Sequence, residues 1–381
     1  MTQRIAVIGG GINGAGATWE LARRGYDVVL FEKGVCGAQT SSATTKMIHG
    51  GLRYLEHLHF GLVRESLRER AWLLEHAPAL VKPLQILLPL YGDSPRGKAV
   101  VRLGLVLYDR LARDAKIAAH RFHSANELPG RPPLRREGLR GAFSYWDAQV
   151  DDFALVRSVV ASAIRDGATV REHTRVTRLV RDGDGWLVRT EHDESRFDLV
   201  VNAAGPWMNE LLRENGIAAR YTLSLVRGSH LVLNRRVSDV GLLLQSTTDR
   251  RVFFVLPWKE TTLVGTTEVV QTGSPDHVTA TDEEIEYLLV RYNRYMAEPL
   301  TRDGVAGTFA GVRPLVGLAA NPSVLSRDAR ITRDGNLINV FGGKLTTFMA
   351  LSRKVALRAD NYFGRTRDAR EPVFAVDTLG A

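Results

Sequence analysis

The sequence contains almost no cysteine and no long apolar run, and each scarcity excludes a class of protein. Cys36 is the only cysteine among 381 residues, so an internal disulfide and a cysteine-based metal cluster are excluded. No apolar run approaches the roughly 20 residues that a membrane-spanning helix needs. An apolar strand begins almost at Met1, so we expect no secretory signal and a reducing, cytoplasmic compartment. The length then allows one large domain or two interleaved ones.

Acidic residues are in the minority, and this imbalance restricts the partners. The chain has 51 Lys and Arg against 42 Asp and Glu, which gives a net charge of +9. A basic surface favours an anionic partner, which could be a phosphorylated substrate, nucleic acid or an anionic membrane. Neither a helix-turn-helix nor a zinc-finger spacing is present, so we expect no nucleic-acid partner.

A glycine-rich turn follows the first apolar strand, residues 5–8. Gly9, Gly11 and Gly14 have the G-x-G-x-x-G spacing. The first glycine permits a tight turn, the second lets the backbone approach a pyrophosphate, and the third lets the next helix pack on the strand. That helix, residues 13–24, directs its N-terminal amides and dipole at the phosphates. The order of strand, glycines and helix predicts a dinucleotide-binding unit.

The end of the second strand supports the same prediction. Residues 26–31 form that strand, and Glu32 follows about twenty residues after the glycines, where an acid accepts a hydrogen bond from a ribose hydroxyl. A carboxylate there repels a 2′-phosphate, which disfavours NADP. The motif alone leaves FAD and NAD open.

Two later strands also end in glycine turns. The strand at 198–204 ends in N-A-A-G-P-W, and the strand at 337–341 is followed by Gly342 and Gly343 and a helix to residue 358. Ligands of open α/β sheets bind at the carboxyl ends of strands. We therefore expect both turns to lie near the dinucleotide, and the second to offer helix amides to a negative group.

The remaining pattern predicts several helices and a second sheet. Helices are expected at 60–77, 96–121, 151–166 and 282–295. Strands are expected at 84–90, at 223–233, 251–256 and 262–267, and in a hairpin within 170–190. The short polar breaks between the strands after residue 222 indicate a mainly antiparallel sheet, and therefore a second domain.

The candidate helix at 96–121 is basic and amphipathic. Such a helix can lie on an anionic membrane, or it can be an ordinary core-facing helix with a solvated basic face. The sequence leaves these two interpretations open.

The whole set of motifs resembles one known family. The chain is similar to the FAD-dependent glycerol-3-phosphate dehydrogenases, within the D-amino-acid-oxidase-like flavoproteins. The motifs that carry this resemblance are at 8–16, 40–57, 146–152, 202–207, 227–230, 265–268, 311–315 and 341–348. The block K-M-I-H-G-G-L-R-Y-L-E at 46–56 is the most specific of them.

The resemblance implies an α/β fold, with a Rossmann-like FAD-binding domain interleaved with a mainly antiparallel substrate domain. We expect the FAD-binding domain at 1–80, 141–215 and 306–365, the substrate domain at 81–140 and 216–305, and a C-terminal tail at 366–381. Many family members continue into a C-terminal helical domain, which we expect this chain to lack. A second departure is Glu268, where the family commonly has aspartate in G-T-T-D.

The resemblance also implies the residues that hold FAD. The expected cofactor-binding set is Gly9, Gly11, Asn13, Gly14, Glu32, Thr40, Ser41, Ser42, Lys46, His49, Gly50, Val176, Ala204, Gly205, Gly343, Lys344, Leu345 and Thr346. Within this set, the residues from Gly343 to Thr346 would face the pyrimidine end of the flavin ring. Negative charge develops there on reduction, and helix amides stabilise it.

The implied substrate is sn-glycerol 3-phosphate, which would be oxidised to dihydroxyacetone phosphate. Arginine suits a phosphate because its planar fork binds two oxygens. The expected substrate-binding residues are Arg53, Tyr54, Arg251, Arg313, Arg327 and Lys344. Arg313 would also act in catalysis. The base for the C2 hydroxyl would be His230, or in second place His49, because histidine titrates near working pH.

Two other functions stay open. One is an oxidase of the same superfamily that acts on an amine, amino acid or 2-hydroxy acid, and the other is a flavin-binding module without catalysis. For the dehydrogenase we expect electrons to pass to quinone, with oxygen as the alternative, and peripheral contact with the inner face of the cell membrane. A homodimer is one candidate for the oligomeric state, and no metal is expected.

Overall fold

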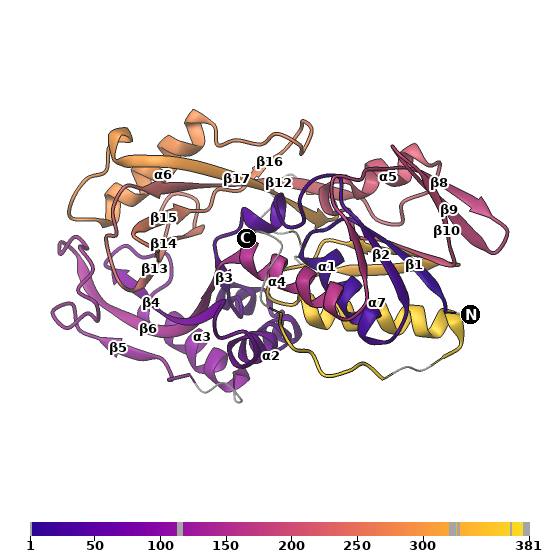
Figure 1. Ribbon diagram of the computed structural model, residues 1–381. Helices are drawn as coiled ribbons and strands as arrows, with labels where there is room; N and C mark the ends of the chain where they lie inside the picture. Colours follow the sequence, from indigo (N-terminus) through magenta and orange to yellow (C-terminus); the bar gives the residue numbers. More distant parts are fainter. Residues whose placement is uncertain (1, 113–116, 320–324, 326–327, 366–367, 376–381) are drawn as a thin grey trace.

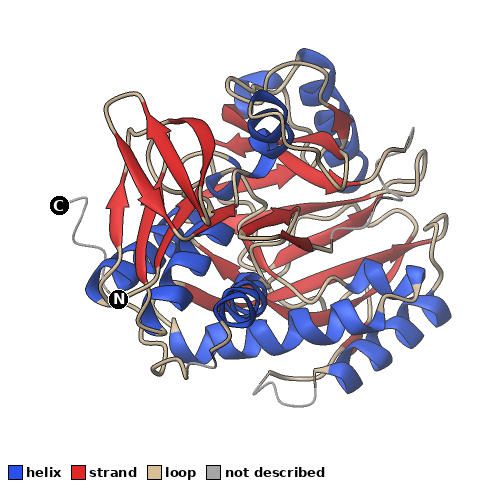
Figure 2. Cartoon of the chain, turned by 90° about the vertical axis from the view of Figure 1, so that its right-hand side faces the viewer, coloured by secondary structure: helices blue, strands red, loops and turns tan. Residues whose placement is uncertain are grey.

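The computed structural model describes residues 2–112, 117–319, 325, 328–365 and 368–375. Two sheets dominate this part of the chain and lie beside each other (Figure 1). Helices flank the strands on both sides in the perpendicular view of Figure 2. The architecture is the α/β fold with two interleaved sheets that the sequence predicted.

The smaller sheet has six strands and carries the N-terminal motif. Its order is β18 (Arg330–Asp334), β19 (Leu337–Phe341), β11 (Leu199–Asn202), β1 (Arg4–Ile8), β2 (Asp27–Phe31) and β7 (Thr169–Arg171). All neighbours are parallel except β18 and β19. β1 lies inside this sheet, and Ile5, Ala6 and Val7 are fully buried. Burial on both faces explains why its sequence is a continuous apolar run.

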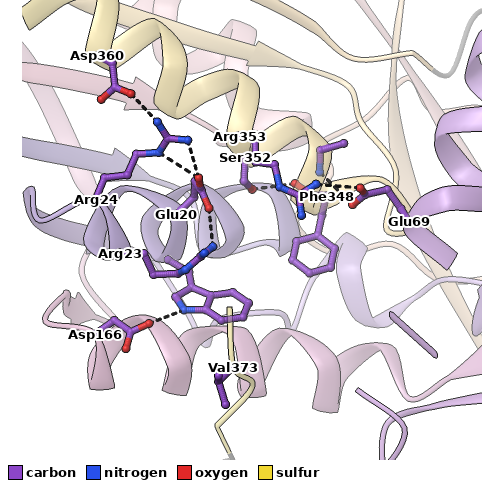
Figure 3. Close-up of polar contacts among 12 residues, drawn as sticks. Glu20, Arg23, Arg24, Glu69, Asp166, Phe348, Ser352, Arg353, Asp360 and Val373 are labelled. Carbon is purple, nitrogen blue, oxygen red and sulfur yellow. Dashed lines mark hydrogen bonds and ion pairs between the residues drawn. The ribbon is translucent and has the colours of Figure 1, made fainter. Parts of the chain in front are cut away.

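Helix α1 (Ile12–Arg23) packs against α4 (Asp152–Arg165) and α7 (Phe348–Phe363). A buried charge network supports this packing (Figure 3): Glu20 pairs with Arg23 and Arg24, and Arg24 also pairs with Asp360 of α7 at 2.5 Å. The C-terminal segment runs past the same helices, where Arg165 donates to the carbonyl of Val373 at 2.8 Å. These contacts fix the orientation of α1, whose N-terminus faces the predicted nucleotide site.

The larger sheet has ten strands among the described residues and is mainly antiparallel. Its main order is β16 (Val269–Val270), β12 (Leu223–Leu233), β15 (Thr261–Gly265), β14 (Val252–Trp258), β13 (Gly241–Gln245), β4 (Val81–Tyr91), β6 (Leu139–Val150) and β3 (Met47–Ile48). Strand β17 (Val305–Val316) also pairs with β12, and β5 (Arg121–His123) with β6. Of these pairs, only β13 with β4 is parallel. The antiparallel second sheet is therefore confirmed.

The remaining helices and strands complete the described chain. They are the hairpin sheet of β8 (Val176–Asp182), β9 (Gly185–Thr190) and β10 (Glu194–Phe197), and the helices α2 (Phe60–His76), α3 (Lys98–Leu111), α5 (Met208–Glu214) and α6 (Asp282–Tyr295). There are also short 3-10 helices η1 (Thr40–Ser42), η2 (Leu52–His57), η3 (Gly205–Trp207) and η4 (Arg302–Gly304). α6 has the predicted bounds, because Thr281 and Glu284 form a reciprocal capping box.

Three details differ from the sequence-based expectations. The helix expected at 96–121 covers only Lys98–Leu111, because the chain re-enters the large sheet as β5 at Arg121. Residues 141–150 and 306–316, expected in the FAD-binding domain, lie in strands of the large sheet. Helix α7 begins at Phe348, so residues 343–346 form a loop before the helix rather than its first turn.

Candidate cofactor and substrate site

A cleft of about 460 Å³ lies between the two sheets. It is lined from the small sheet by the turn between β1 and α1 and by the end of β2. From the large sheet, it is lined by β14 and β17. η1, η2 and the loop before α7 close its sides. The predicted site residues that line it are Gly9, Gly11, Asn13, Glu32, Thr40, Ser41, His49, Arg53, Tyr54, Val176, Ala204, Gly205, Arg251, Arg313, Gly343, Lys344, Leu345 and Thr346.

The glycine motif packs as its spacing predicts. Gly9 has φ +103°, and a Cβ there would lie 2.6 Å from the carbonyl oxygen of Ala203. A Cβ on Gly14 would lie 1.8 Å from the oxygen of Gly9, so helix and turn touch backbone to backbone. The amide of Ile12 donates to the hydroxyl of Ser41 at 3.0 Å. Gly14 therefore acts in packing and does not line the cleft.

Glu32 is held at the edge of the cleft by backbone amides. Its Oε2 accepts from the amide of Gly10 at 2.7 Å, and its Oε1 accepts from the amide of Gly34 at 2.9 Å. The side chain is 9% exposed and lines the cleft. The carboxylate therefore has a fixed position next to the glycine turn, as hydrogen bonding to a ribose requires.

Lys46 lies behind the cleft rather than in it. Its Nζ is 2.5 Å from Oδ1 of Asp152, a fully buried residue in the first turn of α4, and donates to the carbonyl of Ser42 at 2.5 Å. Thr44 donates to the same carboxylate at 2.7 Å. Lys46 thus anchors the loop that carries the lining residues. Like Lys46, the predicted residues Ser42 and Gly50 do not line the cleft.

The loop before α7 closes over the start of α1. Gly343 has φ +113°, and a Cβ there would lie 2.4 Å from Nδ2 of Asn13, which donates to the carbonyl of Gly342 at 3.1 Å. The buried Oδ1 of Asn13 has no hydrogen-bond partner within the described chain. Thr346 accepts from the amide of His49 at 3.3 Å. The start of α1, the loop before α7 and the loop at His49 therefore meet at one place.

Three predicted arginines converge on one carboxylate at the other end of the cleft. Glu268 lies 3.9 Å from NH1 of Arg53, 3.9 Å from NH1 of Arg313 and 4.0 Å from Nε of Arg251. Its side chain is 7% exposed and lines the cleft. Nearby, the Nζ of Lys344 lies 3.9 Å from the ring centre of Tyr54. Arg327, the remaining arginine of the prediction, lies outside the described residues.

His230 is buried beneath the cleft and does not line it. Its ring stacks on Phe309 at 4.7 Å, and its Nε2 lies 3.0 Å from Oγ1 of Thr45, which does line the cleft. Burial, followed by the charges of Arg313 and Lys46, lowers the pKa of His230 to about 3. The imidazole is therefore neutral at ordinary pH, and in the tautomer that carries its proton on Nδ1, its Nε2 accepts a hydrogen bond from Thr45. His49 lines the cleft directly.

The lining residues whose chemistry the sequence did not indicate include Glu268, Thr45 and Asp147. Glu268 had been noted only as a departure from a motif, and Thr45 was one of several hydroxyls in a polar loop. The available signal for Thr45 was its place directly before Lys46, the residue that begins the most specific block of the chain.

The donor set fits a flavin dinucleotide. Gly9, Gly11 and Gly343 line the cleft without side chains, so the backbone can approach a ligand closely there, and the carboxylate of Glu32 is held beside the glycine turn, where a ribose would lie. The cleft continues from there to the arginine cluster, which gives room for a second ligand beside the cofactor. No group of His, Cys, Asp and Glu side chains among the described residues could hold a metal ion.

Comparison with known proteins agrees with this geometry. The model of the FAD dependent oxidoreductase family matches residues 4–357. The chain belongs to this family. FAD is therefore its cofactor, and the protein is an oxidoreductase.

The relatives found by sequence are dehydrogenases. The chain is 38% identical to the D-erythritol 1-phosphate dehydrogenase of Brucella abortus (strain 2308), over 94% of this chain and 74% of that protein. It is 37% identical to the glycerol-3-phosphate dehydrogenase of Pseudomonas tolaasii, over 95% and 72%. It is 35% identical to the aerobic glycerol-3-phosphate dehydrogenase of Escherichia coli (strain K12), over 95% and 74%.

Solved structures support the fold of this FAD-dependent oxidoreductase. The glycerol-3-phosphate dehydrogenase from Bacillus halodurans, complexed with FAD, aligns with a TM-score of 0.76 at 24% identity, over 97% of this chain and 66% of that chain. The L-alpha-glycerophosphate oxidase from Mycoplasma pneumoniae, with FAD bound, also has a TM-score of 0.76 at 18% identity, over 98% and 97%.

Proposed function

We propose that this protein oxidises a polyol phosphate to the corresponding ketone, with sn-glycerol 3-phosphate as the first candidate and dihydroxyacetone phosphate as its product. The observation that carries the proposal is the arginine cluster. Arg53, Arg251 and Arg313 place three positive charges around the carboxylate of Glu268, and Lys344 adds a fourth to the lining of the same cleft. A dianionic phosphate neutralises most of the excess charge, whereas an uncharged polyol neutralises none of it.

The arginines would bind the phosphate, and Thr266 and Glu268 would orient them. Arg313 donates to Oγ1 of Thr266 at 2.7 Å, and Arg251 donates to the carbonyl of Glu268 at 3.2 Å. Because their side chains are already held, little rotamer freedom is lost when the phosphate binds. The planar guanidinium can then offer two N–H groups to two phosphate oxygens.

Oxidation also requires that the substrate hydroxyl lose its proton. FAD, when bound, accepts the hydride from the substrate carbon. We propose that the hydroxyl proton passes to Oγ1 of Thr45 while the proton of Thr45 passes to Nε2 of His230. The low pKa of His230 keeps the ring neutral before the reaction, so its Nε2 is free of a proton in the tautomer protonated at Nδ1. His49 is the alternative acceptor, because it lines the cleft itself.

The names of the relatives support the substrate class. D-Erythritol 1-phosphate dehydrogenase and glycerol-3-phosphate dehydrogenase both carry a polyol phosphate in their names. Rates with a dye acceptor should therefore be compared for glycerol 3-phosphate, D-erythritol 1-phosphate, glycerol and erythritol. We expect turnover only with the phosphorylated compounds. Faster turnover of an amino acid or a 2-hydroxy acid would favour the oxidase instead.

We also propose peripheral contact between α3 and an anionic membrane, with quinone as the electron acceptor. None of the helices in the described chain has the length and apolar character of a membrane span. The exposed side chains of Val100 and Leu103 lie on α3, and exposed Leu58 follows η2, which packs against α3. Arg102 and Arg110 are exposed on the same helix. Apolar groups among basic ones suit reversible binding to anionic lipid.

The homodimer, one candidate for the oligomeric state, stays a prediction.

A further inference from the structure

We propose that Tyr108 is a positioning residue for the flavin site, and that its hydroxyl fixes the backbone of the turn at residues 49–51. Tyr108 lies on α3 and does not line the cleft. Its hydroxyl accepts from the amide of Gly50 at 2.8 Å and donates to Oδ1 of Asp147 at 2.7 Å. The proposal rests on the flavin-dependent oxidation proposed above, since it assigns a role within that site.

The network around Tyr108 is buried and closely spaced. Arg70 donates to the same Oδ1 of Asp147 at 2.5 Å, and Arg70, Tyr108 and Asp147 are each at most 2% exposed. Burial and the neighbouring Asp147 raise the pKa of Tyr108, so its hydroxyl keeps its proton and remains a donor to that carboxylate. A buried hydrogen-bond network of this kind favours one geometry, because a displacement leaves further buried polar groups unsatisfied, in addition to the Nε of Arg70, which has no partner within the described chain.

The turn held by this network leads to both halves of the site. His49 lines the cleft on one side of Gly50, and η2 with Arg53 and Tyr54 begins directly after Gly51. The turn passes close to its neighbours, since a Cβ on Gly50 would lie 2.4 Å from Leu67 and 2.5 Å from the hydroxyl of Tyr108, so only glycine fits there. Without that hydroxyl, the amide of Gly50 keeps only the 3.3 Å contact to Asp147.

The test compares Tyr108→Phe with Tyr26→Phe in the holoenzyme. Tyr26 is a matched control because its buried hydroxyl also donates to a carboxylate, Oδ1 of Asp360 at 2.7 Å, and that carboxylate is also paired with an arginine. Tyr26 does not line the cleft. Phenylalanine keeps the ring in both variants, so both should fold with a similar loss of melting temperature.

Hydrogen exchange of the peptide that spans residues 47–52 gives the direct readout. We expect exchange to become at least about tenfold faster in Tyr108→Phe and to stay unchanged in Tyr26→Phe. The rate of flavin reduction at saturating glycerol 3-phosphate should fall about tenfold or more only in Tyr108→Phe, because a small misplacement near the reacting atoms is costly.

Equal exchange in the two variants, or equal reduction rates, would overturn the proposal. Fast exchange of the Gly50 amide in the wild-type holoenzyme would overturn it without any variant. If no polyol phosphate reduces the wild-type flavin, the proposed function fails, while the exchange experiment still decides the role of Tyr108.

Discussion

At the scale of single residues, Glu268 arranges the proposed phosphate site. One carboxylate at 3.9–4.0 Å from three arginines lowers their mutual repulsion before any substrate arrives. An incoming phosphate then meets side chains that already converge. Glutamate is one methylene longer than the aspartate that is common at this position in the glycerol-3-phosphate dehydrogenases. Its carboxylate therefore extends further toward the three arginines.

Arg313→Ala should weaken the reaction strongly without loss of flavin. Arg313 lines the cleft and is held by Thr266, so its removal deletes a preset phosphate ligand. Loss of a charge-assisted contact of this kind costs about 2–4 kcal/mol, or roughly 30- to 1000-fold in kcat/KM. Steady-state kinetics with glycerol 3-phosphate measures the change. Arg235→Ala removes an exposed arginine on the large-sheet side and is the control. Unchanged kinetics in Arg313→Ala would exclude it as a phosphate ligand.

His230 should make stability depend on pH. Its pKa is about 3 in the folded protein, below the ordinary value of 6.5 that applies when the chain unfolds. Between these values the unfolded state binds the extra proton, so this group destabilises the fold as pH falls below 6.5 and has no effect above it. The slope is at most about 1.4 kcal/mol per pH unit.

Denaturant unfolding at pH 5 and pH 8 tests this effect. His230→Gln should reduce the difference in unfolding free energy between the two pH values, whereas the exposed control His192→Gln should leave it as in the wild type. The same pH dependence in all three proteins would show that His230 is not buried as a neutral group.

The sequence predicted those site residues whose role follows from local spacing. Gly9, Gly14 and Glu32 belong to one βαβ unit, and their geometry follows from a short stretch of chain. The gathering of Arg53 and Arg313 on Glu268 depends on how η2, β17 and the loop after β15 pack together, which no local pattern encodes. His230 was assigned as a base, but its place behind Thr45 follows only from the packing of β12 on its neighbours.

At the scale of elements, the N-terminus of α1 is the part that a cofactor needs most. Gly11 precedes this helix and lines the cleft, and a Cβ there would already lie 3.3 Å from Oγ of Ser41. Gly11→Val should therefore yield protein without flavin, because the branched side chain occupies the space of the pyrophosphate.

The ratio of visible to ultraviolet absorbance of the purified protein measures flavin content. Gly61→Val, on α2 with open space around it, is the matched control and should stay yellow. A yellow Gly11→Val protein with full flavin content would mean that the pyrophosphate lies elsewhere.

Helix α3 should carry the contact with anionic lipid. Each basic residue near such a surface contributes about 1 kcal/mol, and salt screens this attraction within a Debye length. Co-sedimentation with anionic and neutral liposomes, at low and high salt, measures binding. The variant Arg102→Glu with Arg110→Glu should lose binding to anionic liposomes at low salt.

The control double variant changes the net charge by the same amount at two residues outside α3. Arg178 and Arg189 are exposed on the hairpin sheet, far from α3 in Figure 1. Changing both to glutamate should leave sedimentation nearly unchanged. If both double variants pellet like the wild type, α3 is not the membrane contact.

Elements with strong local signals were predicted well, and those decided by the tertiary fold were not. α6 has both a periodic apolar face and a capping box, and its bounds were correct. α3 was predicted too long because the apolar period continues past Leu111, whereas pairing of β5 with β6 decides where the chain leaves the helix. The start of α7 was placed too early because the glycines resemble a tight helix entry, but both adopt positive φ in an open loop.

At the scale of the whole molecule, the site exists only where the two sheets meet. The small sheet contributes the glycine turn and Glu32, and the large sheet contributes Arg251 and Arg313. The two halves are also joined at the outer end of the cleft. There, Lys33 forms an ion pair with Asp276, and its Nζ lies over the ring of Trp207, 3.8 Å from the ring centre. The sequence predicted two interleaved domains. It did not predict that β6 and β17, which were expected in the FAD-binding domain, belong to the large sheet.

The most direct test of the central claim is anaerobic mixing of the yellow holoenzyme with substrate, followed by visible absorbance. We predict that glycerol 3-phosphate or D-erythritol 1-phosphate bleaches the flavin, and that glycerol and erythritol at equal concentration do not. Equal bleaching by the unphosphorylated polyols would contradict a phosphate-binding arginine cluster. Bleaching by an amino acid or 2-hydroxy acid alone would identify an oxidase, and no bleaching by any of these compounds would indicate a flavin-binding module without catalysis.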